Sequence, residues 1–308
     1  MTRVLVTGGA GFIGANLARA LLERGDEVRV LDNFSTGNRA NLDDLDVEIV
    51  EGELRSYERV HHATRRAEVV FHLGALGSVP RSVQDPLTSS AVNVEGTLNV
   101  LLAARDEGVR RVVFSSSSSV YGAKDELPVT ESLPPDPISP YGVAKLAAER
   151  YCISFNRVYE SFESVVLRYF NVFGPRQSPY SQYAAMVPLF IRAIAEGEAV
   201  TVFGDGEQSR DFTYVENVVD ATLRAAEADG ATGRIFNVAA GSPASVNEVA
   251  ATIGRILDKP VERRFAPPRP GDIRNSWADV GAARDVLGYQ PFVDLEEGLR
   301  RTIEHLVA

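Results

Sequence analysis

Tyr141 and Lys145 are the two side chains of this sequence whose types and spacing most directly suggest chemistry. Residues four apart lie on one face of a helix, and Pro140 before the tyrosine favours a helix start at this point. An ammonium beside a phenol favours the phenolate over the usual phenol pKa of about 10. The pair therefore predicts a general base that works near neutral pH, suited to redox chemistry at a carbinol.

A tyrosine followed four residues later by a lysine also occurs by chance on solvent-exposed helix faces. Two more distant features favour the catalytic interpretation here. A glycine-rich turn lies near the N-terminus, and a run of five serines at 115–119 precedes the pair. The combination predicts a redox site that holds a dinucleotide.

The glycine-rich turn consists of Gly8, Gly11 and Gly14, between an apolar segment and an amphipathic one. In this context the first glycine allows a tight turn, and the second lets the backbone approach a pyrophosphate. The third lets helix and sheet pack closely, and the helix N-terminus attracts negative charge. The turn therefore predicts dinucleotide binding.

Asp32 ends the second predicted strand, 18 residues after Gly14. A carboxylate at this point accepts hydrogen bonds from the adenosine ribose hydroxyls and repels a 2′-phosphate. Asp32 thus favours NAD over NADP, although Arg39 in the same loop has the opposite effect. An alternative role for Asp32 is to cap the turn at 33–37.

Short β-branched segments alternate with helical patterns from residue 3 to about 170. The predicted elements are strands at 4–6, 28–31, 47–50, 69–72, 112–115 and 165–167, with a helix at 12–24 after the first of them. Such alternation predicts an α/β fold, with parallel strands joined by crossovers into a doubly wound sheet of the Rossmann type.

The sequence changes character after residue 170, where Gly- and Pro-rich loops become frequent. The helices predicted there lie near 184–196, 215–228, 245–257 and 295–307. We therefore expect two domains, an NAD-binding domain at 1–170 and a smaller, loop-rich α/β lobe for the substrate at 171–308. A strand predicted at 234–238 could return to the first sheet, so this boundary is approximate.

Composition excludes several classes of function. With 308 residues, 44% of them hydrophobic, the chain can bury a large core, and its net charge of −10 argues against a nucleic-acid partner. The single cysteine, Cys152, excludes an internal disulfide and suits a reducing compartment. No secretion signal or membrane-spanning segment is readable, and the four histidines lack metal-ligand spacing. We expect a cytoplasmic protein without a metal or a membrane partner.

With these motifs placed, the sequence resembles the extended short-chain dehydrogenase/reductase family, and within it the UDP-hexose 4-epimerases. The resemblance runs nearly from end to end and includes the stretches 32–37, 71–75, 93–97, 167–171 and 204–212. It implies NAD-dependent C4 epimerisation of a UDP-hexose through a 4-keto intermediate, with the cofactor regenerated in each cycle. It also implies a homodimer packed through helices near 87–106 and 141–159.

The resemblance assigns roles to individual residues. Ser117 is implied to hydrogen-bond the reacting hydroxyl, beside Tyr141 and Lys145, although the neighbouring serines leave this assignment open by one residue. Tyr141 and Lys145 are also implied to contact the cofactor, with Lys145 holding the nicotinamide ribose. Further cofactor contacts are implied for Phe12, Ile13, Asn33, Ser35, Gly37, Glu53, Leu54, Leu73, Ala75, Asn93, Ser115 and Tyr169. Substrate contacts are implied for Ser118, Ser119, Asn171, Val187, Arg210, Arg269, Asp272 and Ser276. The alternatives are a polar strand exit for the serines and surface ion pairs for the arginines.

Departures from the family pattern narrow the prediction. Ser119 stands where dehydratases and decarboxylases of the family carry a glutamate, so a second acid/base is missing and simple epimerisation is favoured. Gly77 replaces a lysine that contacts the nicotinamide in some glucose/galactose epimerases, and Glu53 replaces an aspartate. Ser276 replaces a bulky tyrosine and leaves room for a 2-acetamido group. UDP-GlcNAc and UDP-GalNAc therefore join UDP-glucose and UDP-galactose as expected substrates.

Two other functions stay open at this point. In a UDP-glucuronate 4-epimerase the serine run would bind the C5 carboxylate, and hydroxyls and backbone amides are suited to that task. A noncatalytic NAD-binding sensor or scaffold on the same fold is the second alternative. The presence of Ser117, Tyr141 and Lys145 counts against it.

Overall fold

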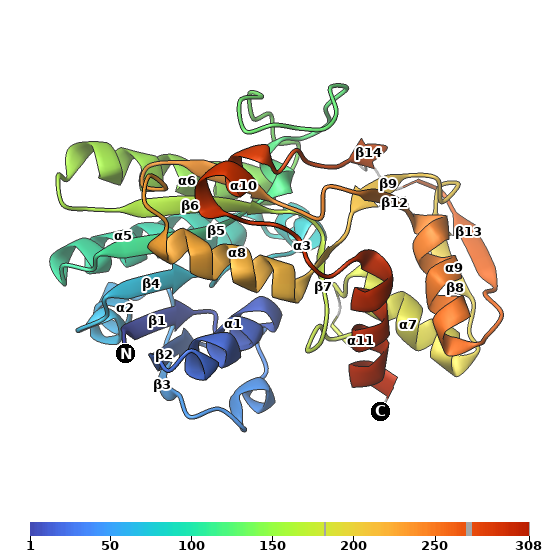
Figure 1. The fold of residues 1–308 in the computed structure, drawn as a ribbon, viewed down its shortest axis with the longest axis horizontal. Coiled ribbons are helices and arrows are strands. Elements are labelled where there is room, and N and C mark those ends of the chain that lie inside the picture. The colour runs from blue at the N-terminus through green and yellow to red at the C-terminus, as the bar shows by residue number, and fades with distance from the viewer. Residues whose placement is uncertain (182, 269–272, 308) are drawn as a thin grey trace.

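The computed structural model describes residues 1–181, 183–268 and 273–307. Arg269 and Asp272, two of the expected substrate contacts, lie outside the described residues. Figure 1 shows a large sheet covered by helices, beside a smaller part with short strands. We call residues 3–169 and 215–238 the sheet region, and residues 170–214 and 239–307, as far as they are described, the loop-rich region.

Seven parallel strands form the central sheet. Their order is β3 (Glu48–Glu51), β2 (Glu27–Asp32), β1 (Arg3–Thr7), β4 (Val69–His72), β5 (Arg111–Ser117), β6 (Ser164–Tyr169) and β11 (Ile235–Val238). The predicted Rossmann-type sheet is confirmed, and the strand predicted at 234–238 does return to it. The strand order reverses between β1 and β4, and ligands of such sheets bind outside the carboxyl ends of the strands at this point.

Helices cover both faces of the sheet (Figure 1). The sheet alternates its side chains between two cores: Val4 and Val6 of β1 join the core with α1 (Phe12–Glu23) and α8 (Val215–Glu227). Leu5 between them joins the core with α2 (Tyr57–Thr64), α5 (Gly96–Asp106) and α6 (Pro140–Val158). Because inner strands such as β4 are buried on both faces, they read as continuous apolar runs in the sequence.

Short segments connect the sheet to its helices near the carboxyl edge. They are η1 (Arg39–Leu42), α3 (Val79–Gln84), α4 (Pro86–Ser90), η2 (Ala91–Glu95) and η3 (Ser118–Val120). Helix α8, predicted at 215–228, packs against β5 and β6. Residues 215–238 therefore lie with the sheet, although the predicted domain division placed all of them except the strand in the substrate lobe.

The loop-rich region contains three small sheets. In these, β7 (Val172–Phe173) pairs with β10 (Thr213–Tyr214), β8 (Val200–Phe203) pairs with β13 (Arg263–Ala266), and β9 (Ser209–Asp211) lies between β12 (Pro243–Ser245) and β14 (Asn275–Ser276). The helices are α7 (Met186–Glu196), α9 (Val246–Leu257), α10 (Gly281–Leu287) and α11 (Leu295–Val307). Three of them confirm the helices predicted at 184–196, 245–257 and 295–307. In the described ranges, none of the helices combines the length and apolar character needed to cross a bilayer.

Candidate active site

The glycine-rich turn has no room for a side chain at Gly8 and Gly14. A Cβ on Gly14 would lie 2.2 Å from the Gly8 carbonyl oxygen, and one on Gly8 would lie 2.6 Å from the Gly74 Cα. Gly8 also has a φ of +69°, which other residues rarely adopt. Helix α1 follows with Gly11 as its N-cap and no side-chain cap, so its first amide groups stay available to an anionic ligand.

Asp32 lies at the carboxyl end of β2 and binds backbone on both sides. One carboxylate oxygen accepts from the Ala10 N–H at 2.9 Å, and the other accepts from the Phe34 N–H at 2.8 Å. The turn-capping role considered as an alternative is therefore present. Since each carboxylate oxygen has two acceptor sites, Asp32 can cap this turn and still accept from ribose hydroxyls.

A cavity of about 340 Å³ runs along the carboxyl ends of β1, β2, β3 and β4. It brings together ten of the residues expected to contact the cofactor, namely Gly8, Gly11, Asp32, Asn33, Ser35, Gly37, Glu53, Leu54, Leu73 and Ala75. Sequence reasoning missed further lining residues, which are Leu31, Thr36, Gly52, Arg55, Gly74, Leu76, Arg81, Thr88 and Val92. Most of these adjoin predicted residues in the same loops, whereas Arg81 and Thr88 come from α3 and α4, whose approach only the tertiary structure reveals.

Phe12, Ile13, Gly14, Asn93, Ser115 and Tyr169, also expected at the cofactor, do not line this cavity. Phe12 and Ile13 form the first turn of α1. Asn93 is buried and exchanges hydrogen bonds with the backbone of Leu76, behind the cavity wall. The Tyr169 hydroxyl is buried against Thr222 of α8 at 2.7 Å. In this structure Asn93 and Tyr169 thus support the site from behind.

A buried histidine joins the glycine turn to the cavity wall. The Thr7 hydroxyl accepts from the Gly74 N–H and lies 2.7 Å from His72 Nδ1. On the other side His72 Nε2 lies 3.0 Å from the Thr97 hydroxyl, which donates to the Asn93 carbonyl. Burial lowers the pKa of His72 to about 3, with Lys145 acting in the same direction. This histidine is therefore a neutral structural link with its proton on Nε2.

Helix α6 carries Tyr141 in its first turn. The Ser139 side chain caps the helix by accepting from the Gly142 N–H at 3.1 Å, and Pro140 follows as predicted. The Tyr141 N–H donates to the Ser82 hydroxyl of α3 at 3.1 Å. The tyrosine is thus fixed both by its own helix and by the segment that borders the cofactor cavity.

Lys145 lies one turn further along α6 and is buried. Its ammonium donates to the Ser115 carbonyl at 2.8 Å and lies 4.9 Å from the centre of the Phe114 ring. Burial lowers the pKa of Lys145 to about 8, which nearby Cys152 and Glu149 oppose. Ser115, expected at the cofactor, here contributes its carbonyl to hold this ammonium.

The pKa of Tyr141 differs from the expectation based on its spacing to Lys145. Burial raises the pKa of Tyr141 to about 12, although the hydrogen-bonding Ser117 side chain acts in the opposite direction. The predicted depression below the value of a free phenol is therefore wrong for this structure. The four-residue spacing puts the two side chains on one helix face, but it does not reveal that burial dominates the pKa of Tyr141.

The structure separates the serines of the run. Ser116 is buried and its hydroxyl donates to Glu149 at 2.6 Å, so it faces α6. Ser117 ends β5, and its hydroxyl donates to the Ser119 hydroxyl at 3.1 Å. Ser118 and Ser119 form the short η3 turn beyond the strand. Among the serines considered, Ser117 is the one that interacts with Tyr141.

A second cavity, of about 560 Å³, lies in the loop-rich region. It brings together three of the expected substrate contacts, Asn171, Val187 and Arg210. Other members of its lining, which sequence reasoning missed, include Phe173, Phe190, Thr201, Phe203, Gln208, Phe212 and Arg264. Ser276 does not line this cavity, but it pairs with Arg210 between β14 and β9.

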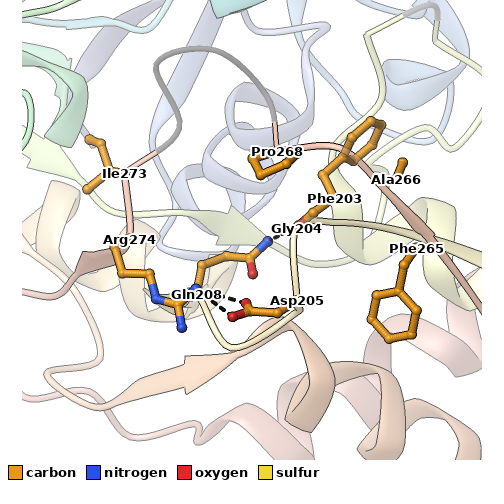
Figure 2. Close-up of a pocket in the computed structure, with 9 residues that line it drawn as sticks. All are labelled: Phe203, Gly204, Asp205, Gln208, Phe265, Ala266, Pro268, Ile273 and Arg274. Carbon is orange, nitrogen blue, oxygen red and sulfur yellow. Dashed lines mark hydrogen bonds and ion pairs between the residues drawn. The ribbon is translucent and has the colours of Figure 1, made fainter.

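A third cavity, of about 730 Å³, adjoins the second and shares Phe203 and Gln208 with it. Figure 2 shows its lining, in which Arg274 and Asp205 form an ion pair at 2.8 Å. The same close-up shows Gln208, whose amide donates to the Phe203 carbonyl at 2.6 Å. This space belongs to the same end of the loop-rich region and continues the second cavity.

Asp211, next to Arg210, is a buried anchor of the loop-rich region. Its carboxylate accepts from the N–H groups of Ala240 at 2.8 Å, Gly241 at 3.1 Å and Ala278 at 3.3 Å. Burial raises the pKa of Asp211 to about 6. The anchor holds β9, and with it Arg210, to the loop that follows β11 of the central sheet.

No group of three or more His, Cys, Asp or Glu side chains in the ranges 1–181, 183–268 and 273–307 has an arrangement that could hold a metal ion.

The family follows from a match across most of the chain. Residues 4–239 match the NAD dependent epimerase/dehydratase family. The chain belongs to this family. The match confirms the resemblance seen in the sequence, and it identifies NAD as the cofactor, as Asp32 predicted.

Similar proteins of known name cover this chain almost completely. UDP-glucose 4-epimerase from Mycolicibacterium smegmatis is 41% identical over 312 residues, covering 98% of this chain and 97% of its own. The structure of UDP-glucose 4-epimerase from Thermotoga maritima with UDP-glucose has a TM-score of 0.95 at 39% identity, covering 99% of both chains. UDP-N-acetylglucosamine 4-epimerase from Methanobrevibacter ruminantium M1, in complex with UDP-N-acetylmuramic acid, has a TM-score of 0.94 at 38% identity, covering 99% and 98%.

Proposed function

We propose that this protein epimerises UDP-hexoses at C4, with NAD as a cofactor that is regenerated in each cycle. The order of strands along the carboxyl edge of the sheet carries the proposal. The strands β2, β1 and β4 end at the cofactor cavity, and β6 leads into Asn171 of the second cavity. The strand between them, β5, ends in Ser117 beside Tyr141. The reacting groups thus lie between the place for NAD and the place for a UDP-sugar.

The residues of β5 and α6 have complementary tasks in this proposal. Tyr141 takes the proton of the sugar 4-hydroxyl, and Ser117 hydrogen-bonds the same oxygen. When bound, NAD accepts the hydride from C4 and returns it to the opposite face of the 4-keto sugar. Lys145 holds the nicotinamide ribose and adds positive charge near the phenol, which favours the phenolate against the effect of burial.

Arg210 holds the diphosphate while the sugar turns. A guanidinium binds phosphate oxygens through two parallel hydrogen bonds, so it fixes the nucleotide end without restraining the hexose. The anchor at Asp211 keeps this arginine in place relative to the central sheet. Arg269 and Asp272 are proposed as further contacts on the basis of the sequence resemblance alone.

Ser276 bears on the choice of sugar. Its pairing with Arg210 places this small side chain next to the proposed diphosphate contact. A small residue beside the sugar site leaves space for a 2-acetamido group. We therefore propose that UDP-GlcNAc and UDP-GalNAc are substrates in addition to UDP-glucose and UDP-galactose.

A homodimer is proposed with the helices expected from the sequence as its interface. Several large apolar side chains of α3, α4 and α6 are exposed: Val83, Leu87, Val143 and Val158 are 63%, 83%, 54% and 65% exposed. Apolar side chains that cluster on a surface favour a protein partner. A cytoplasmic location is proposed from the single cysteine, which is reduced and buried.

The decisive experiment follows C4 stereochemistry by proton NMR. Purified protein is incubated separately with UDP-glucose, UDP-GlcNAc and UDP-glucuronate, with and without added NAD. We expect conversion of UDP-glucose and UDP-GlcNAc. Exclusive conversion of UDP-glucuronate would mean that the serine run binds the C5 carboxylate and determines the substrate. Inactivity toward all three sugars, with NAD bound, would contradict the proposal and favour a noncatalytic role.

A further inference from the structure

Glu149 is a fully buried carboxylate one helical turn after Lys145. Tyr141, Lys145 and Glu149 are spaced by four residues, so they form one stripe along α6. Glu149 accepts hydrogen bonds from the Ser116 hydroxyl at 2.6 Å and from Arg168 Nε and Nη2 at 2.9 and 2.7 Å. Neither the proposed mechanism nor the sequence reasoning assigns it a role.

The stripe on α6 engages three consecutive residues of β5. Lys145 binds the carbonyl of Ser115, Glu149 binds the hydroxyl of Ser116, and Tyr141 interacts with the side chain of Ser117. A displacement of α6 along β5 would break all three interactions together. Glu149 therefore fixes the register between the helix that carries the base and the strand that carries its partner.

Arg168 of β6 extends this arrangement to the next strand. Its guanidinium is 1% exposed, forms a two-bond ion pair with Glu149 and lies over the Tyr121 ring at 4.5 Å. Buried ion pairs add little net stability, because the cost of removing two charges from water offsets their attraction, and apolar residues of similar volume often serve as well. A purely structural explanation for Glu149 is therefore weak.

The charge of Glu149 also acts on Lys145. Burial lowers the pKa of Lys145, whereas the negative charge of Glu149 raises it and so favours the ammonium. The groups that face Lys145 are Glu149 and Cys152 of α6, the Ser115 carbonyl and the Phe114 ring of β5, and the neutral His72 of β4. Of these, only Glu149 carries a full negative charge, because burial keeps the Cys152 thiol protonated.

We infer that Glu149 is a positioning residue for the reaction: through Ser116 and Arg168 it sets the place of Ser117 against α6, and its charge keeps Lys145 in the ammonium form. The first half of this inference rests on the proposed function. The second half concerns Lys145 itself and can be tested without a substrate.

The chain offers a direct measurement of Lys145. It contains only three lysines, Lys124, Lys145 and Lys259, so protein labelled with ¹³C at the lysine ε-carbon gives few signals. The Lys145 signal is identified by its loss in Lys145→Met and is followed from pH 6 to 11. We expect Glu149→Gln to lower its titration midpoint by about one pH unit.

Glu163→Gln is the matched control. Glu163 lies just before β6 and pairs with Arg111 at 2.7 Å, so it forms a glutamate–arginine contact at the opposite end of β5 from the serines. This variant is expected to leave the Lys145 titration unchanged. A titration that is also unchanged in folded Glu149→Gln protein would overturn the charge half of the inference.

Two catalytic readouts follow, the pH profile for the charge half and a double variant for the positioning half. With a lower Lys145 pKa, the alkaline limb of the kcat profile moves to lower pH, and kcat of Glu149→Gln at pH 8 falls about fivefold. The double variant Glu149→Leu with Arg168→Leu removes both charges and avoids an unpaired buried ion, so it guards against simple unfolding. We expect it to fold with its KM nearly unchanged and its kcat at least about tenfold lower.

The possible outcomes separate the two proposals. Full kcat in the folded double variant would overturn the positioning role of Glu149 while leaving the proposed epimerisation intact. Inactivity of the parent protein toward every UDP-hexose would overturn the proposed epimerisation and the positioning half with it. In that case the lysine titration would still decide whether Glu149 controls the charge of Lys145.

Discussion

The two regions of the molecule hold their ligand sites by different means. At the cofactor site, backbone packs against backbone: the turn at Gly8 lies against Gly74 after β4, and the buried contact between Thr7 and His72 links the same two strands. The substrate side consists of strands of two to four residues, with an exposed ion pair between Arg274 and Asp205 and a deeply buried anchor at Asp211. This difference in packing suits the proposed chemistry. NAD stays in place throughout the reaction, whereas the sugar must turn between the two hydride transfers.

The largest effect is expected at the boundary between the two regions. Tyr141→Phe removes the proton acceptor and leaves the ring, so kcat should fall about 10³-fold. NAD binding, measured by calorimetry, should change little, because the cofactor cavity is lined by other residues. Tyr151→Phe is the control on the same helix, since its side chain is 39% exposed, and it should keep full activity.

Gly14→Ala tests the backbone packing of the cofactor site. The new methyl group would meet the Gly8 carbonyl at 2.2 Å, so we expect a loss of about 2 kcal/mol in the free energy of unfolding and at least about tenfold weaker NAD binding. Urea unfolding and calorimetry provide the two measurements. Gly77→Ala is the matched control, because a methyl group there has no neighbour within 4 Å. Equal affinity for NAD in both variants would show that the turn tolerates side chains.

Asp211→Asn tests the anchor of the substrate side. The amide has one oxygen in place of two and turns an N–H₂ group toward backbone donors, so the hold on β9 weakens. We expect KM for the UDP-sugar to rise about tenfold with kcat within about a factor of three. A change confined to kcat would argue against a role in holding Arg210.

The same carboxyl group predicts a dependence of stability on pH. Because the pKa of Asp211 is about 6 in the folded protein and about 4 in an unfolded chain, the folded state binds the proton more tightly. Its contribution to stability is therefore full below pH 4 and is lost as the pH rises to 6, by about 2 to 3 kcal/mol. The stability of the parent relative to Asp211→Asn, measured by urea unfolding at pH 4.5 and 7, should fall accordingly. A constant difference would contradict the raised pKa.

The smallest effect is expected for the exposed pair of the loop-rich region. The side chains of Arg274 and Asp205 are 60% and 55% exposed, and ion pairs in water contribute little. Asp205→Asn should leave the melting temperature unchanged within error. A clear loss of stability would mean that the loop-rich region depends on surface charges more than its buried anchor suggests.

The sequence predicted the central sheet closely because its strands are buried on both faces and alternate with amphipathic helices. Even β11, far from the other strands in the chain, agrees with the strand predicted at 234–238. The small strands such as β7 and β14, with two residues each, are too short to show a period. Their pairing depends on contacts between distant segments, for example Ser276 with Arg210.

The prediction of the site was best where backbone geometry demands a residue type. Gly8, Gly14 and Asp32 are such positions, and the structure gives each a direct steric or hydrogen-bonding reason. Glu149 was missed although it lies four residues after Lys145, because a glutamate in a helix is usually exposed. The raised pKa of Tyr141 was missed for a related reason, since spacing along a helix does not report burial.

The position of β11 has a consequence for the order in which the protein can fold. Strand β6 ends at Tyr169, but its outer neighbour begins only at Ile235, after much of the loop-rich region. During synthesis the edge of β6 stays unpaired until Val238 has left the ribosome, and open edges invite pairing with other chains. The chain therefore cannot be divided at residue 170 into independent modules, and an exchange of substrate specificity between relatives has to proceed by substitutions within the loops.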